Sequence, residues 1–321
     1  MTGPTMKALV CVGPPNLVEL REVRPPFAEQ GDAIVRVEAV SVNRGELHRL
    51  MSSSHFGWQP GWDFAGVVVR APGGTVPAGS RVCGLVVEGS WAEQLTVPTG
   101  QIARIPDNVS TEAAAALPVA GLTALRVLRL RGDLAGQSVL VHGAAGGVGR
   151  FAVQLARRAG AHVSAVVGSP ERARGVQQLG AHEVVHGLQG LRRRYDLILE
   201  SVGGSILCQS IDLLAPGGLM VCFGSSSQAE TTLSIADFYS KQAIIRGFYL
   251  LYDIVREAPA ADLEYLLKLS ADGELVTDVA AVADWTDAAS ILSRLRARQI
   301  AGKAVLRTCP PSPRAPVGTD E

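Results

Sequence analysis

The stretch LVHGAAGGVGRFAVQLARRAG, residues 140–160, runs from a strand-like segment through a turn of small residues into a helix-like segment. A pyrophosphate at a helix N-terminus needs bare backbone N–H groups and the positive end of the helix dipole. Glycines at the turn leave room for such a group. The order of strand, glycine turn and helix therefore predicts a phosphate cradle, and a tight bend between packed elements is the alternative.

The turn departs from the strict GxGxxG fingerprint, because Ala144 occupies the first glycine position. Its context still favours a cofactor site, since the helix is followed by a second strand, HVSAVV, that begins near residue 162. Gly149 would let the helix pack closely on the strand, and Gly160 would end that helix as a C-cap. The residues that we expect to bind the cofactor here are Ala145, Gly146, Gly147 and Val148.

The end of the second strand indicates which nicotinamide cofactor is bound. Sites for NAD place an acidic residue there, and the corresponding residue of this chain is Gly168. Without a carboxylate to repel a 2′-phosphate, Ser169 and Arg172 can hydrogen-bond and neutralise that group. The sequence therefore predicts NADPH over NADH. A Ser-Pro helix start with a solvated arginine is the alternative interpretation.

Strands alternate with helices from residue 138 to about 248, which is typical of a doubly wound parallel sheet. Within this series SPERARGVQQLG (169–180) is expected to be a helix, and AIIRGF (243–248) the last strand. The first 110 residues read instead as short strands between Pro, Gly and polar turns, typical of a small barrel or folded sheet. A helix should begin after Ser110, and two amphipathic helices and a strand, GKAVLR, follow the alternating series. The tail from residue 309 should be disordered.

Bulk composition excludes several classes of protein. The 321 residues are 47% hydrophobic and 19% charged with a formal net charge of zero, so no global field attracts nucleic acid or an acidic membrane. The N-terminus has no signal-peptide pattern, and no apolar run approaches the ~20 residues of a membrane helix. Five cysteines without a CxxC pair disfavour a disulfide framework and a structural zinc lobe. We therefore expect a cytoplasmic protein.

The chain resembles the medium-chain dehydrogenase/reductase superfamily, in its zinc-free branch of quinone oxidoreductases and enoyl reductases. The matching stretches follow the family order and are VRVEAVSVN (35–43), GWDFAGVV (61–68), LPVAGLTAL (117–125), VHGAAGGVG (141–149), LGA (179–181), PGGLMVCFG (216–224) and GKAVL (302–306). The resemblance implies an α/β fold, in which a GroES-like β-domain accompanies a Rossmann doubly wound parallel sheet. It implies a GroES-like substrate domain over residues 1–117, completed by 258–308, and a Rossmann NADPH-binding domain over 118–257. Members are commonly homodimers that pair the last Rossmann strand, here Ala243–Phe248.

The resemblance also implies further cofactor contacts and the absence of a metal. Positions that usually touch the cofactor are Thr123, His186, Gly224 and Lys303, with histidine standing at 186 where the family usually has tyrosine. Zinc-containing members carry a cysteine near residue 43 and GHE at 61–63, where this chain has Asn43 and Gly61-Trp62-Asp63. Without soft ligands at tetrahedral spacing, we expect no metal and no alcohol dehydrogenation.

The segment VNRGELH (42–48) supplies the candidate catalytic residues. Asn43 matches an asparagine of the family's active-site segment, and it could instead only stabilise a turn. His48 lies where some quinone reductases have tyrosine and would donate to a carbonyl oxygen or deliver a proton, although a surface histidine is equally expected. His142 lies inside a strand and should instead satisfy a buried hydrogen bond. The candidate pocket residues are Trp58, Trp62, Tyr249 and Tyr252, and core or dimer packing is the alternative for the two tyrosines.

These residues predict an NADPH-dependent oxidoreductase that transfers hydride to an activated C=C bond or a quinone. Such substrates are already electrophilic, so the protein has only to position them and stabilise the oxyanion that forms. One alternative is a stand-alone enoyl or ketone reductase acting on a biosynthetic, polyketide-like intermediate. Another is a non-catalytic NADPH-binding protein.

Overall fold

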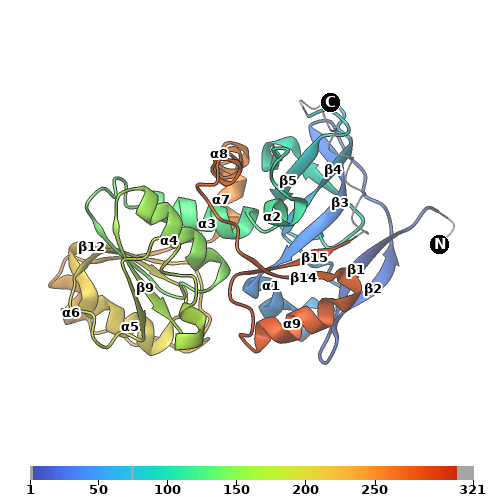
Figure 1. Cartoon of the computed structure of the whole chain (residues 1–321). Coiled ribbons are helices and arrows are strands. Elements are labelled where there is room, and N and C mark those ends of the chain that lie inside the picture. The colour runs from blue at the N-terminus through green and yellow to red at the C-terminus, as the bar shows by residue number, and fades with distance from the viewer. Residues whose placement is uncertain (1–2, 74–75, 309–321) are drawn as a thin grey trace.

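The computed structural model describes residues 3–73 and 76–308, and Figure 1 shows two sheet-containing parts with helices between them. The expectation of a disordered tail concerns residues 309–321, which lie outside the described residues. In the part of the chain that the structure describes, no helix is long and apolar enough to cross a membrane.

A six-stranded sheet carries the alternating series, and all of its strand pairs are parallel. Its order is β10 (Glu183–His186), β9 (His162–Val167), β8 (Ser138–Val141), β11 (Tyr195–Glu200), β12 (Leu214–Cys222) and β13 (Ile244–Gly247). Val139 and Val141 belong to a core cluster shared with α3 (Pro118–Arg129) and α4 (Gly147–Arg158). Leu140, between them, packs in a second cluster with α5 (Gly204–Leu213). Because alternate side chains meet helices on opposite faces, the predicted doubly wound sheet is confirmed.

The helix that follows the glycine turn begins at Gly147, after an N-cap at Gly146, and ends before Gly160 as expected. The helix expected over SPERARGVQQLG was wrong, because the segment forms only the short 3-10 turn η3 (Pro170–Ala173) and then a series of turns. Gly175 has φ +79°, which ends any helical course there. In addition, Arg150 of α4 donates to the carbonyl of Arg174 over 3.0 Å, so that oxygen serves the neighbouring helix.

A seven-stranded sheet combines five strands from the first 110 residues with two strands from residues 279–307. Its strands are β14 (Val279–Asp284), β15 (Lys303–Arg307), β3 (Asp32–Val42), β4 (Asp63–Arg70), β5 (Arg81–Leu85) and β7 (Ile102–Arg104), with β6 (Gln94–Pro98) also paired to β3. Beside it, β1 (Met6–Gly13) and β2 (Leu17–Val23) form a hairpin. β15 runs antiparallel to β3 with Ala304 opposite Val42, so Lys303 lies next to the end of β3.

The remaining helices connect and flank the two sheets. They are α1 (Arg44–Leu50), η1 (Ser53–His55), η2 (Thr99–Gln101), α2 (Thr111–Ala115), α6 (Ile235–Tyr239), α7 (Leu250–Arg256), α8 (Ala260–Ala271), η4 (Trp285–Asp287) and α9 (Ala288–Arg296). Ser110 caps α2 as predicted, because its hydroxyl accepts from the N–H of Ala113. Figure 1 shows α3, α7 and α8 between the two sheet-containing parts. Arg126 of α3 is bonded to Asp253 and Asp262, which ties these three helices together.

Candidate functional site

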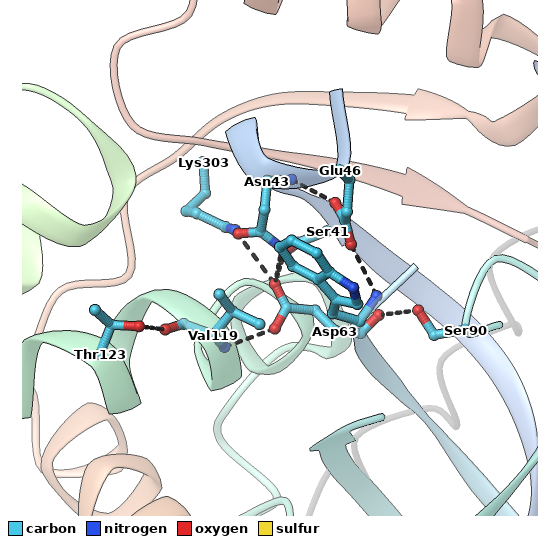
Figure 2. Close-up of polar contacts among 9 residues, drawn as sticks. Ser41, Asn43, Glu46, Asp63, Ser90, Val119, Thr123 and Lys303 are labelled. Carbon is cyan, nitrogen blue, oxygen red and sulfur yellow. Dashed lines mark hydrogen bonds and ion pairs between the residues drawn. The ribbon is translucent and has the colours of Figure 1, made fainter. Parts of the chain in front are cut away.

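A buried carboxylate, Asp63 at the start of β4, gathers polar groups from three separate elements (Figure 2). One of its oxygens accepts from the Ser41 hydroxyl and from Nδ2 of Asn43 at 2.8 Å. The other accepts from the backbone N–H of Val119, at the start of α3, over 2.6 Å. Sequence reasoning treated this residue only as part of a missing zinc motif. The signal that could have found it is a charged residue at the start of an otherwise apolar strand segment.

Lys303 completes this arrangement from the far end of the chain. Its ammonium donates to Oδ1 of Asn43 at 2.6 Å and lies 3.3 Å from the Asp63 carboxylate, and the residue is only 3% exposed. Figure 2 shows Asn43 between the lysine and the aspartate. The amide therefore bonds through its oxygen to a cation and through its nitrogen to an anion. Asn43 is half-buried, so the candidate catalytic residue of the sequence lies within a fixed polar network.

Glu46 supports the same segment and was also missed by sequence reasoning. Its carboxylate accepts from the backbone N–H groups of Asn43 at 2.6 Å and Trp62 at 2.8 Å, and so holds the start of α1 against the start of β4. The side chain has no exposed surface. Burial, reinforced by the nearby Asp63 charge, raises the pKa of Glu46 to about 8.

The glycine turn lies beside this network and satisfies the requirements of an anion site. Helix α4 has no side-chain cap at Gly146 and no acidic residue in its first turn. A Cβ on Gly149 would lie 2.6 Å from Cα of Ala144, and one on Gly147 would lie 2.8 Å from Cδ of Lys303. Ala145 is buried, whereas Gly146, Gly147 and Val148 keep part of their surface exposed. The bare N–H groups and the helix dipole therefore fit a dinucleotide pyrophosphate.

Residues beyond β9 form the other candidate end of the cofactor site. β9 ends at Val167, so Gly168 follows it directly, and a Cβ on Gly168 would meet no atom within 4 Å. His186, at the end of β10, has Nε2 3.1 Å from the Gly168 carbonyl. The Ser169 hydroxyl donates to the fully exposed Glu171, which lowers the pKa of that carboxyl. Glu171 thus adds one negative charge beside Ser169 that sequence reasoning did not weigh.

Three arginines, Arg44, Arg172 and Arg298, lie close enough in this region for their positive charges to repel one another. Burial lowers the pKa of Arg172, and the charges of Arg298 and Arg150 lower it further. Arg44, at the start of α1, shows the same effect, with burial first and then the charges of Arg298 and Arg172. Among the described residues, none of Arg44, Arg172 and Arg298 forms an ion pair with a carboxylate. Such uncompensated guanidinium groups suit a phosphate. Sequence reasoning identified only Arg172, because the other two come from distant segments.

Helix α1 also contacts the six-stranded part through the two basic residues of its last turn. Gln228 donates to Nδ1 of the exposed His48, so the neutral imidazole carries its hydrogen on Nε2. Arg49 donates to the Tyr249 hydroxyl over 2.8 Å. The two proposed sides of the site are therefore joined by hydrogen bonds at α1. Tyr249 is 56% exposed and Tyr252 66% exposed, so packing in the core is wrong for both tyrosines.

The two tryptophans differ in their surroundings. Trp62 is buried, and its indole N–H has no partner among the described residues. Trp58 is half-buried and donates to Glu88 over 2.9 Å. The Arg49 guanidinium lies 5.6 Å from the Trp58 ring centroid and 5.3 Å from that of Trp62, within cation–π range. Both tryptophans therefore lie around the same side chain of α1.

The remaining predicted residues fall in different environments. Thr123 is 6% exposed and donates to the Val119 carbonyl over 2.6 Å, one turn earlier in α3 (Figure 2). Gly224 is exposed, and a Cβ there would lie 3.3 Å from Ser201. His142 is buried with Nε2 2.9 Å from the Ser210 hydroxyl, which confirms the expected buried hydrogen bond. Burial lowers the pKa of His142 to about 4.

The chain was compared with family models and known proteins. Residues 29–107 match the alcohol dehydrogenase GroES-like domain, and residues 147–269 match the zinc-binding dehydrogenase model. Prostaglandin reductase-3 of Bos taurus is 32% identical over 286 residues, which are 81% of this chain and 74% of that protein. Quinone oxidoreductase of Lama guanicoe is 30% identical over 259 residues, which are 74% and 77% of the two chains.

The chain is also similar to one solved structure and to part of one much longer protein. The Escherichia coli quinone oxidoreductase complexed with NADPH has a TM-score of 0.83 and 25% identity, covering 94% of this chain and 99% of that one. A highly reducing polyketide synthase of Arthrinium phaeospermum is 33% identical over 255 residues, but the chain spans only 10% of that protein's length. These matches cover both sheet-containing parts. The chain therefore belongs to the medium-chain dehydrogenase/reductase superfamily of oxidoreductases, in its quinone oxidoreductase-like branch.

Proposed function

We propose that this protein is an NADPH-dependent reductase of a C=C bond conjugated to a carbonyl group, or of a quinone. The observation that carries the proposal is the position of Lys303, whose side chain lies against the bare start of α4 while its ammonium bonds to Asn43. A site for the cofactor's phosphates and a polar group suited to a carbonyl oxygen thus meet at one residue. The relatives named for reduction of quinones and prostaglandins support the same class of substrate.

The cofactor, when bound, supplies the hydride, and the chain's own residues bind and stabilise what receives it. The N–H groups at the start of α4 would hold the pyrophosphate. Asn43 would donate to the substrate's carbonyl oxygen and so stabilise the negative charge that develops there. His48 would donate a hydrogen bond from Nε2 to the substrate, because its Nδ1 already accepts from Gln228, and the enolate would then take its proton from water.

The preference for NADPH rests on the uncompensated arginines at the end of β9. Arg172 and Arg298 would neutralise the 2′-phosphate, and Arg44 would add a third positive charge from the other side of the site. A hydrogen bond to a charged group contributes about 1.5–3 kcal/mol, so Arg172→Ala should weaken NADPH binding by roughly 10- to 100-fold. NADH binding should change little. Equal loss of both affinities in a direct titration would contradict the role of Arg172.

We further propose that the site works without zinc. The groups that meet at the position of the zinc relatives' motif include the Lys303 ammonium, whose charge opposes a bound cation. In the part of the chain that the structure describes, no cluster of three His, Cys, Asp or Glu side chains could hold a metal ion. Elemental analysis should therefore find no stoichiometric zinc, and turnover should survive a chelator. Activity lost to a chelator and restored by zinc would refute this statement.

We propose that two copies pair through β13 and that the chain divides at 117/118 and 257/258, with residues 258–308 completing the first domain. β13 is the last strand of the six-stranded sheet, and Ile244 of this strand is exposed, as are Ile235 and Tyr239 of the preceding α6. An exposed edge strand with apolar neighbours is suited to pairing with a second copy. Ile244→Lys should shift the mass measured by light scattering from dimer to monomer. A monomeric parent protein would contradict the proposal.

The four described cysteines are free, which accords with a reducing, cytoplasmic setting.

A substrate panel tests the main proposal and separates it from its alternatives. Purified protein with NADPH is offered quinones, enones, enoyl thioesters and simple ketones, and cofactor oxidation is followed at 340 nm. We expect quinones or conjugated carbonyl compounds to be reduced and simple ketones not to be. Selective turnover of an enoyl thioester would favour a stand-alone enoyl reductase, which the match to a polyketide synthase also supports. Binding of NADPH without any turnover would favour a non-catalytic cofactor-binding protein.

A further inference from the structure

The buried pair of Lys303 and Asp63 lies on either side of the Asn43 side chain (Figure 2). Asp63 has no exposed surface and Lys303 is 3% exposed, so water screens neither charge. The carboxylate is held in place by the Ser41 hydroxyl and by the backbone N–H of Val119. Two fixed opposite charges therefore act on the two ends of a single amide.

We propose that Lys303 is a positioning residue, which together with Asp63 fixes the Asn43 amide so that one N–H of Nδ2 remains for the substrate's carbonyl oxygen. The inference rests on the proposed reductase function and names the residue that prepares its oxyanion-binding group. It assigns Lys303 a role through Asn43, in place of the direct cofactor contact that the family resemblance implies.

The charges select one of the two orientations of the amide. In the observed orientation Oδ1 accepts from the ammonium at 2.6 Å, and Nδ2 donates to the carboxylate at 2.8 Å. Turning the amide over would place two donors together at Lys303 and two acceptors together at Asp63. An amide nitrogen carries two hydrogens, and Asp63 takes only one of them. Because Asn43 is half-buried at the start of α1, the second N–H can serve a bound substrate.

The backbone keeps the lysine at this position. Gly302 has φ +115° and forms a parallel bridge with Gly146, so the start of β15 lies against the start of α4. The Lys303 side chain then passes over Gly147, where a Cβ would come within 2.8 Å of its Cδ. Its ammonium is left with Asn43 and Asp63 as its hydrogen-bonding partners among the described residues. The glycine turn and the orientation of Asn43 are thus coupled through one side chain.

The first test observes the amide directly and needs no cofactor or substrate. The chain has only three asparagines, Asn16, Asn43 and Asn108, so labelling with [15N]asparagine gives three side-chain NH2 groups, and Asn43→Ala identifies one of them. In Lys303→Met the Asn43 amide signals should shift and their hydrogens exchange at least ~10-fold faster. Lys268→Met removes an exposed lysine paired with Asp272 and should leave all three groups unchanged. Unaltered Asn43 signals in Lys303→Met would overturn the inference.

The second test is a double-mutant cycle with the best substrate of the panel. Lys303→Met should lower kcat at least ~10-fold and leave the Kd for NADPH within about 3-fold. Adding it to Asn43→Ala should cause no further loss, because both changes remove the same interaction. A raised Kd for NADPH with unchanged kcat would make Lys303 a cofactor contact, and independent losses would also overturn the inference. The pair Lys303→Met with Asp63→Asn leaves no unpaired buried charge and repeats the amide measurement if the single variant unfolds, with the introduced asparagine adding a fourth side-chain NH2 group. A wild-type protein without turnover would refute the proposed reductase, while the amide measurement would still decide this inference.

Discussion

The stability of the protein should depend on the ionisation of Glu46. Its pKa is about 8 in the folded state against an ordinary 4.5, so between these values the folded chain keeps a proton that the unfolded chain has lost. Raising the pH through this window therefore favours unfolding, by about 1.4 kcal/mol per pH unit and about 5 kcal/mol in all. Above pH 8 both states are ionised and the contribution no longer changes.

Chemical denaturation of the wild type and of Glu46→Gln at pH 5, 6, 7 and 8 measures this effect. Glutamine has one acceptor oxygen for the N–H groups of Asn43 and Trp62, so the variant should lose a constant amount of stability. The free energy of unfolding of the variant, relative to wild type, should nevertheless rise by about 1.4 kcal/mol per pH unit. Glu264→Gln, on the exposed side of α8, is the matched control and should show no such trend. A difference between wild type and Glu46→Gln that does not vary with pH would refute the reasoning.

Three further predictions concern the six-stranded part. Gly149→Ala should lower the free energy of unfolding by about 1–3 kcal/mol, because its Cβ would strike the Ala144 backbone, whereas Gly247→Ala meets no atom within 4 Å and should be nearly neutral in thermal denaturation. The pKa of His142 is about 4 against an ordinary 6.5, so the free energy of unfolding should fall by up to about 3 kcal/mol as the pH drops from 6.5 to 4. His142→Gln should remove this dependence on pH, and an unchanged dependence in the variant would contradict the prediction. Gly168→Asp should fold normally and shift cofactor preference at least ~10-fold toward NADH by adding a carboxylate beside the 2′-phosphate site; an unchanged ratio of the two dissociation constants would place the phosphate elsewhere.

The glycine turn and the alternation around it could be predicted because the information is local. Strand β8, the start of α4 and the left-handed Gly160 are all within 23 residues, and each follows from hydrophobic period and glycine placement. The segment after β9 shows the limit of this approach. SPERARGVQQLG has a helical start, but its course is decided by Gly175 and by the Arg150 side chain of another element.

The candidate site could be predicted only in part, because its residues are brought together by pairing between distant strands. Asn43 and Lys303 were each found from their positions in family segments, Lys303 as a cofactor contact, but not as partners of each other. From Asn43, its partner Asp63 lies 20 residues away, and Lys303 lies 260 residues away. The contact between them depends on β15 pairing with β3, and no local pattern reports that pairing. The arginines near Arg172 were missed for the same reason, since Arg44 and Arg298 come from separate ends of the chain.

The burial of three ionisable side chains at one place argues for a role beyond stability. Moving a charge from water into a protein interior costs several kcal/mol per ion, and apolar replacements of buried pairs are often neutral or stabilising. Asp63 and Lys303 are nevertheless both buried within one network, and Glu46 is buried beside them with a raised pKa. Each of them bonds to Asn43: Glu46 accepts its backbone N–H, and the other two hold its side chain. A network that served only the fold would not need to converge on one half-buried amide. Its convergence at the bare end of α4 is what a reductase requires, since a carbonyl oxygen must be met by a donor whose direction is already set.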